Sequence, residues 1–316
     1  MSRPAPIAIL GTGSLAAAAG SLLPDDLEPL IELPGKRFRK IGRFVRLGLA
    51  AASRAAGSAG VASFPAARTG VFLGSGLGNL PDLVGFTESV HDETGERMPS
   101  PIQFAHSVGN SAAFYIAQAF GLSGPVLALS QEEVSFECAL LSASVLLEAG
   151  DIDLALVGGL DVFHPSEEAQ LERMGYAPPQ RAGEGAGWLV LARAGDEAAP
   201  GAPIGLLERV EVRPGESPEE IVRGLDAAER PGALYLNPRL GHLAGEPRRL
   251  ERFDPGYGAF LTANAAAVCA FLAEAAEGAR LHALSLGRDG ELGVIGVRRL
   301  APGAQPGVSV STESGR

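Results

Sequence analysis

The chain has 316 residues, 46% of them hydrophobic, and its 26 Lys and Arg against 37 Asp and Glu give a formal net charge of −11. This composition is typical of a globular protein, and the acidic balance argues against partners that need a basic surface, namely nucleic acid and anionic membranes. Two distant cysteines and five histidines without metal-ligand spacing predict no disulfide framework, no metal site and no bound cofactor.

The start of the chain reads as a strand and not as a targeting segment. A short apolar run at 7–10 is followed by Gly11-Thr12-Gly13, which we interpret as a tight turn. No stretch of eighteen apolar residues without charges occurs, so a cytoplasmic protein is expected.

The first part of the chain is predicted to alternate strands and helices. A helix over 37–57 carries basic residues, which predict a solvated face or, alternatively, a docking patch for an acidic carrier protein (Arg37, Arg39, Lys40 and Arg43). Further strands are expected at 69–74, 126–130 and 152–157, and further helices at 111–120 and 134–149.

A second block repeats this plan. Strands are predicted at 234–236, 281–286 and 293–297, with a helix at 260–275, which indicates two related halves, 1–165 and 166–316, in one integrated unit. The helices at 134–149 and 260–275 are apolar or small nearly all round, and such helices are buried on every face. The sequence therefore predicts an α/β fold in which both helices lie between two sheets, in five αβαβα layers.

Several motifs in this order and spacing resemble those of one enzyme family. They are Phe104-x-x-Ser107-Val108-x-Asn110, Gly121-Leu122-Ser123-Gly124-Pro125, Gly150-Asp151-Ile152-Asp153, Val157-Gly158-Gly159 and Gly183-Glu184-Gly185-Ala186-Gly187. Together they resemble the β-ketoacyl synthases of the thiolase fold, which implies the same five-layered architecture with two pseudo-repeated halves.

The catalytic positions of that family are altered in this chain. Counting from Gly124-Pro125, the resemblance places Glu133 where the family has its nucleophilic Cys. The two catalytic His positions fall on Arg239 and Tyr257, and a different register would instead place a His at His242. No catalytic residue is then intact, and Cys138 and Cys269 are expected to be packing thiols.

Three interpretations of Glu133 remain open at this stage. It is a first-turn acid stabilised by the helix dipole, a partner of Arg239 in an ion pair, or a general base.

The resemblance implies a non-catalytic subunit similar to the chain-length factors of type II polyketide and aryl-polyene systems. Such a subunit forms a heterodimer with an active ketosynthase and shapes its acyl tunnel, while acyl carrier protein contacts it only indirectly. The implied dimer contacts are Phe104, Asn110 and the strand Val126-Leu127-Ala128-Leu129-Ser130. A homodimer, an acyl-thioester decarboxylase or hydrolase using Glu133, Arg239 or His242, and a self-associating scaffold are the alternatives.

Overall fold

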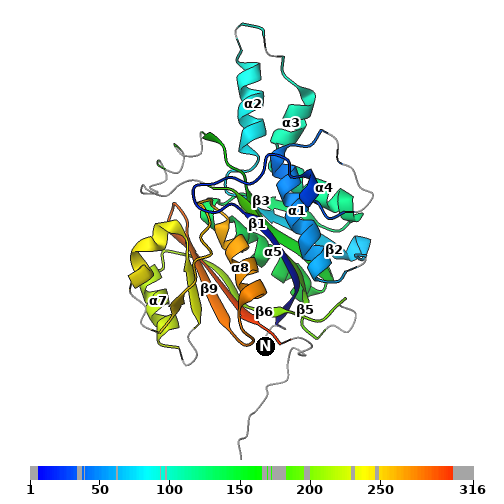
Figure 1. The fold of residues 1–316 in the computed structure, drawn as a ribbon. Helices are drawn as coiled ribbons and strands as arrows, with labels where there is room; N and C mark the ends of the chain where they lie inside the picture. Colours follow the sequence, from blue (N-terminus) through cyan, green and yellow to red (C-terminus); the bar gives the residue numbers. More distant parts are fainter. Residues whose placement is uncertain are drawn as a thin grey trace, which may run out of the picture.

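Ten strands form a single mixed sheet in the computed structural model (Figure 1), in the order β3-β2-β4-β5-β1-β6-β10-β9-β7-β8. The structure describes residues 6–33, 38, 40–61, 63–92, 94–96, 98–165, 169, 172, 183–195, 200–228, 232–245 and 249–301. The first five strands of that order are β3 (Val126–Leu129), β2 (Thr69–Gly74), β4 (Leu154–Asp161), β5 (Gly185–Arg193) and β1 (Ile7–Ala16). The other five are β6 (Gly205–Pro214), β10 (Glu291–Arg299), β9 (Arg280–Leu286), β7 (Ala233–Leu236) and β8 (Glu251–Arg252).

The two halves of the sheet have the same topology. In the first, β2 runs parallel to β3 and β4, β4 is antiparallel to β5, and β5 is antiparallel to β1. In the second, β7, β8, β9, β10 and β6 repeat these relations in the same order. The halves meet where Ile7, Ala8 and Ile9 of β1 pair with β6. The predicted α/β fold with repeated halves is confirmed.

The position of β5 bears on where the repeat divides. The sequence prediction separated 1–165 from 166–316, which would assign β5 to the second half. Because β5 pairs along its length with both β1 and β4, we propose that the division lies between β5 and β6 instead.

Helices form three layers around the two halves of the sheet. The middle layer holds α5 (Ser135–Ala149) and α8 (Ala263–Glu274), whose buried residues share one apolar cluster with strands of both halves. The outer face of the first half is covered by α1 (Arg43–Ser58) and α4 (Ser111–Phe120). The outer face of the second is covered by α7 (Pro218–Asp226) and the 3-10 helix η4 (Pro238–Gly245). This is the expected five-layered arrangement.

Small residues allow these layers to lie close together. A Cβ added to Gly187 of β5 would come within 2.3 Å of the Ala265 backbone, so only glycine lets α8 approach the strand. Gly13 has the same relation to α1, at 2.3 Å from Ala51 O and Ala55 N. Gly11-Thr12-Gly13 is therefore part of β1, and the predicted tight turn after residue 10 is wrong.

Other boundaries also differ from the sequence prediction. The first helix begins at Arg43 with Gly42 as its N-cap, so it starts six residues later than expected. Two helices that the sequence did not predict, α2 (Leu80–Val90) and α3 (Pro101–Ser107), follow β2. These two helices pack together and project from the body of the molecule (Figure 1).

Three short 3-10 helices, η1 (Glu28–Leu30), η2 (Ala66–Arg68) and η3 (Glu132–Val134), complete the named elements. Among the described residues, no helix combines the length and apolar composition that crossing a membrane requires.

Candidate functional site

The start of α5 forms the centre of the candidate site. After β3 the chain turns through η3, where Glu132 has a φ of 47°, a conformation that non-glycine residues seldom adopt. The Ser135 hydroxyl fixes this turn by accepting from the Gln131 N–H (2.8 Å) and donating to Glu132 O (2.6 Å). The turn directs Glu133 inward, and its side chain is 0% exposed.

Glu133 forms an ion pair with Arg239, as one of the three interpretations predicted. The Nε of Arg239 donates to Glu133 Oε1 at 2.7 Å, and 16% of the Arg239 side chain is exposed. Glu133 precedes α5 in the first half of the molecule, and Arg239 follows β7 in the second. The pair therefore links the two halves, and it relieves the large desolvation penalty of a lone buried carboxylate.

A second acid of α5, which the sequence analysis did not single out, lies one turn further on. Glu137 is fully buried, and burial raises its pKa to about 7, with the Glu133 charge adding to the shift. Asn264 of α8 and Ser285 of β9 lie close enough to favour its charged form in part. An acid in the first turn of an otherwise mostly apolar helix was the available sequence signal.

Asp161, at the end of β4, fixes the start of α8. Its buried carboxylate accepts from the Ser75 hydroxyl (3.0 Å), the Thr262 hydroxyl (2.7 Å) and the Thr262 N–H (3.0 Å). Because Thr262 is the N-cap of α8, these bonds join the first half to the start of the second buried helix.

The two remaining predicted residues, Tyr257 and His242, have other contacts. Tyr257 forms a backbone bridge with Ala18, and its pKa is raised by burial and by nearby groups that include Cys269. His242 lies on the exposed side of η4, with Nε2 at 3.5 Å from Glu219 Oε1.

Neither cysteine lies in an environment that activates a thiol. Burial raises the pKa of Cys269 to about 12, and its Sγ donates to Trp188 O at 3.4 Å. The pKa of Cys138 is also raised, by burial and by the neighbouring charges of Glu137 and Glu291. Both thiols are therefore disfavoured as thiolates.

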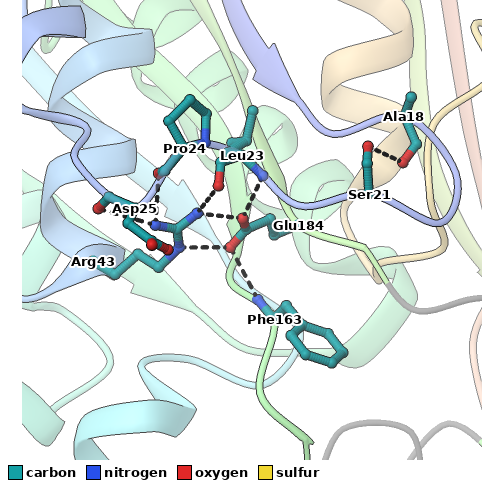
Figure 2. A network of polar contacts seen from close by, with 8 residues as sticks. All are labelled: Ala18, Ser21, Leu23, Pro24, Asp25, Arg43, Phe163 and Glu184. Atoms are coloured by element: carbon teal, nitrogen blue, oxygen red, sulfur yellow. Dashed lines mark hydrogen bonds and ion pairs between the residues drawn. The ribbon is translucent and has the colours of Figure 1, made fainter.

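A second buried ion pair ties the segment after β1 to the core (Figure 2). Glu184, just before β5, accepts hydrogen bonds from Arg43 Nε (2.8 Å) and from the Leu23 N–H (2.9 Å). Arg43 also donates to Leu23 O and Pro24 O. Arg43 was expected to lie on a solvated face of the first helix. In the structure it is instead held by Glu184 and has a structural role. Lys40 is exposed, whereas Arg37 and Arg39 lie outside the described residues.

All but one of the residues expected at a dimer interface are exposed, and Leu129 is only partly exposed. β3 is the terminal strand, Val126 and Leu127 are each 40% exposed, and Phe104 of α3 is 56% exposed. Ala128, Ser130 and Asn110 are exposed as well. Further exposed apolar side chains are Leu83 of α2 and Ile102 of α3. Phe114 of α4 and Val145 of α5, two helices that pack beside β3, are exposed as well. We call these exposed apolar residues the β3 face.

Cavities lie at the carboxyl ends of the parallel strands in both halves. One of about 250 Å³ adjoins the β3 face and is lined by Ser75, Asn110, Ala128 and Ser130, among others. One of about 450 Å³ lies beyond β7, with Asn237, Asp254 and Tyr257 in its lining. Within the described part of the chain, no cluster of three or more His, Cys, Asp or Glu side chains is placed to hold a metal ion.

Comparison with known proteins relates the chain to one family. The model of the beta-ketoacyl synthase N-terminal domain matches residues 12–197, more than half of the chain. The 3-oxoacyl-[acyl-carrier-protein] synthases 2 of Vibrio harveyi and Vibrio cholerae are each 31% identical over 128 residues, or 40% of this chain. The matched segment spans 31% of the length of these relatives.

Solved structures with the same fold cover 94% of this chain and the whole of their own. They include the ishigamide ketosynthase/chain length factor (TM-score 0.69, 22% identity). The others are AntDE:AntF, a type II polyketide synthase acyl-carrier protein in complex with its ketosynthase bound to the hexaketide (0.72, 14%), and a beta-ketoacyl synthase from Burkholderia phymatum STM815 (0.69, 15%). At these identities the likeness establishes the thiolase-like fold.

Proposed function

The chain belongs to the beta-ketoacyl synthase family, and from that premise we propose that it is a non-catalytic subunit similar to a chain-length factor. In this proposal it forms a dimer with an active ketosynthase and shapes the acyl tunnel of that partner. The observation that carries the proposal is the buried Glu133–Arg239 ion pair, which occupies two of the positions that the family resemblance assigns to catalysis.

The chemistry of this pair supports the absence of condensation activity. A carboxylate held by a guanidinium is a poor nucleophile towards a thioester, and a guanidinium does not act as a base near neutral pH. The two thiols offer no substitute, because the pKa of each is raised.

The β3 face supports the proposed dimer. It presents an unpaired strand edge together with exposed apolar side chains from α3, α4 and α5, a combination that marks an interaction surface. The cavity of about 250 Å³ beside this face is where the chain would border a tunnel in its partner.

The charge of the chain supports an indirect relation to acyl carrier protein. A subunit of net charge −11 would repel an acidic carrier at long range, so docking would fall to the ketosynthase partner. The alternative of a hydrolase or decarboxylase gains no support from His242, which contacts Glu219 on the exposed side of η4.

Co-expression with an active type II ketosynthase and an acyl carrier protein tests the proposal. We expect the chain to copurify with the ketosynthase, and the complex but not the isolated chain to elongate acyl groups. Ala128→Leu, which narrows the cavity, is expected to shift the products towards shorter chains, whereas Ser123→Leu, outside the lining, should leave them unchanged. Condensation by the isolated chain, or its stable acylation seen by mass spectrometry, would overturn the proposal.

A further inference from the structure

Glu137 is a buried acid that the proposed function does not use. Its carboxyl group lies against the backbone of β10 at Gly293, in space that a side chain would fill. A Cβ added to Gly293 would lie 2.5 Å from Glu137 Oε1. Neither carboxyl oxygen makes a hydrogen bond of good geometry within the described part of the chain. Asn264 and Ser285, its polar neighbours, hydrogen-bond to each other at 3.1 Å.

The charges around Glu137 are predominantly negative. Glu133 lies one helical turn earlier and forms its ion pair with Arg239. The Glu137 charge is one of the causes that raise the pKa of Tyr235 of β7. On β10, Glu291 lies two residues before Gly293. On α5 itself, Cys138 is the neighbouring titratable group. Two carboxyl groups are therefore buried one helical turn apart.

We propose that Glu137 is a proton-dependent switch in the layer between the two halves of the molecule. When it is protonated, the neutral carboxylic acid packs against β9 and β10, and the Glu133–Arg239 pair carries no net charge. When it is ionised, the same volume contains a second negative charge that has no ion-pair partner among the described residues, which weakens the packing of α5 against the second half.

The direction of the pH dependence follows from the shift of the pKa. Burial raises the pKa of Glu137 from 4.5 to about 7, so the folded state binds its proton more tightly than the unfolded state does. Its contribution to stability is thus fully present below pH 4.5 and is lost as the pH rises through 7. A shift of this size corresponds to a change on the order of 100-fold in the unfolding equilibrium constant.

The test is urea unfolding of the full chain between pH 5 and 8.5. The matched variants are Glu137→Gln and Glu148→Gln, the latter an exposed acid on the same helix. Other titrating groups change stability equally in all three proteins, so the ratio of unfolding constants between wild type and E137Q isolates Glu137. We expect this ratio to rise on the order of 100-fold across the range, and the corresponding ratio for E148Q to stay constant.

A second measurement applies whether or not E137Q folds. In wild-type protein with ¹³C-labelled glutamate, we expect one carboxyl resonance to titrate near pH 7, far above ordinary glutamates. A constant ratio between wild type and E137Q, or the absence of any glutamate titrating above pH 6, would overturn the proposal.

Discussion

Arg239 supplies a positive charge to the buried carboxylate at position 133. Replacing it by Met would leave Glu133 fully buried without its guanidinium. We expect Arg239→Met to lower the free energy of unfolding by about 3–5 kcal/mol, as measured in urea at pH 7. The double variant Glu133→Leu/Arg239→Met removes both charges and is expected to recover most of this loss.

The exposed pair Arg252–Asp254 provides the control for that measurement. Both side chains are more than half exposed, so Arg252→Met is expected to change stability by less than about 1 kcal/mol. Equal losses in the two single variants would contradict the structural role assigned to Glu133–Arg239.

At the residue scale, the ion pair between Glu133 and Arg239 could be predicted from counts along the sequence. The spacing from Gly124-Pro125 located Glu133, and its charge suggested Arg239 as partner because the two family positions adjoin. Glu137 and Arg43 were missed or misjudged for a common reason. Whether a charged side chain is buried depends on which strand or loop packs over it, and for Arg43 that neighbour, Glu184, is 141 residues away.

At the scale of elements, the close packing of helices on glycines predicts that an added side chain at such a glycine lowers stability. Gly13→Ala would place a Cβ 2.3 Å from two backbone atoms of α1, which cannot move aside as a side-chain end does. We expect a loss of at least about 2 kcal/mol in unfolding free energy. The control Gly224→Ala, in the exposed interior of α7 with no atom within 4 Å, is expected to gain about 0.5–1 kcal/mol.

The same packing explains which elements were predictable. The apolar residues all round α5 and α8 predicted the middle layer, and the five layers followed from it. The expected burial of α5 on every face is wrong, because Val145 is exposed. The glycines of β1 were misinterpreted as a turn, because the sequence alone does not reveal that the backbone of α1 lies against them. β6 escaped prediction because most of it beyond Leu207 is only partly buried and its charged residues interrupt the apolar pattern.

The repeat gives β3 and β8 equivalent places at opposite ends of the sheet. Their surfaces differ: β3 has three exposed apolar residues, Val126, Leu127 and Ala128, whereas β8 consists of Glu251 and Arg252. A short, charged edge strand resists pairing with another chain. The sheet therefore offers one edge suited to association, that of the first half.

For the whole molecule, this asymmetry predicts a single dimer surface that can be removed without unfolding the chain. Leu127→Glu places a charge on the exposed face of β3, where the folded monomer still allows hydration, so the melting temperature should hardly change. Burial of that unpaired charge in a dimer costs free energy, so we expect the affinity for a co-expressed ketosynthase to fall at least 100-fold. Sedimentation velocity should then show loss of the complex. Leu22→Glu, at a leucine in the segment after β1 that is even more exposed than Leu127, should leave the complex intact. An L127E protein that still forms the complex with wild-type affinity would show that association uses a different surface, and the cavity beside β3 would then lose its proposed place at the end of a partner's tunnel.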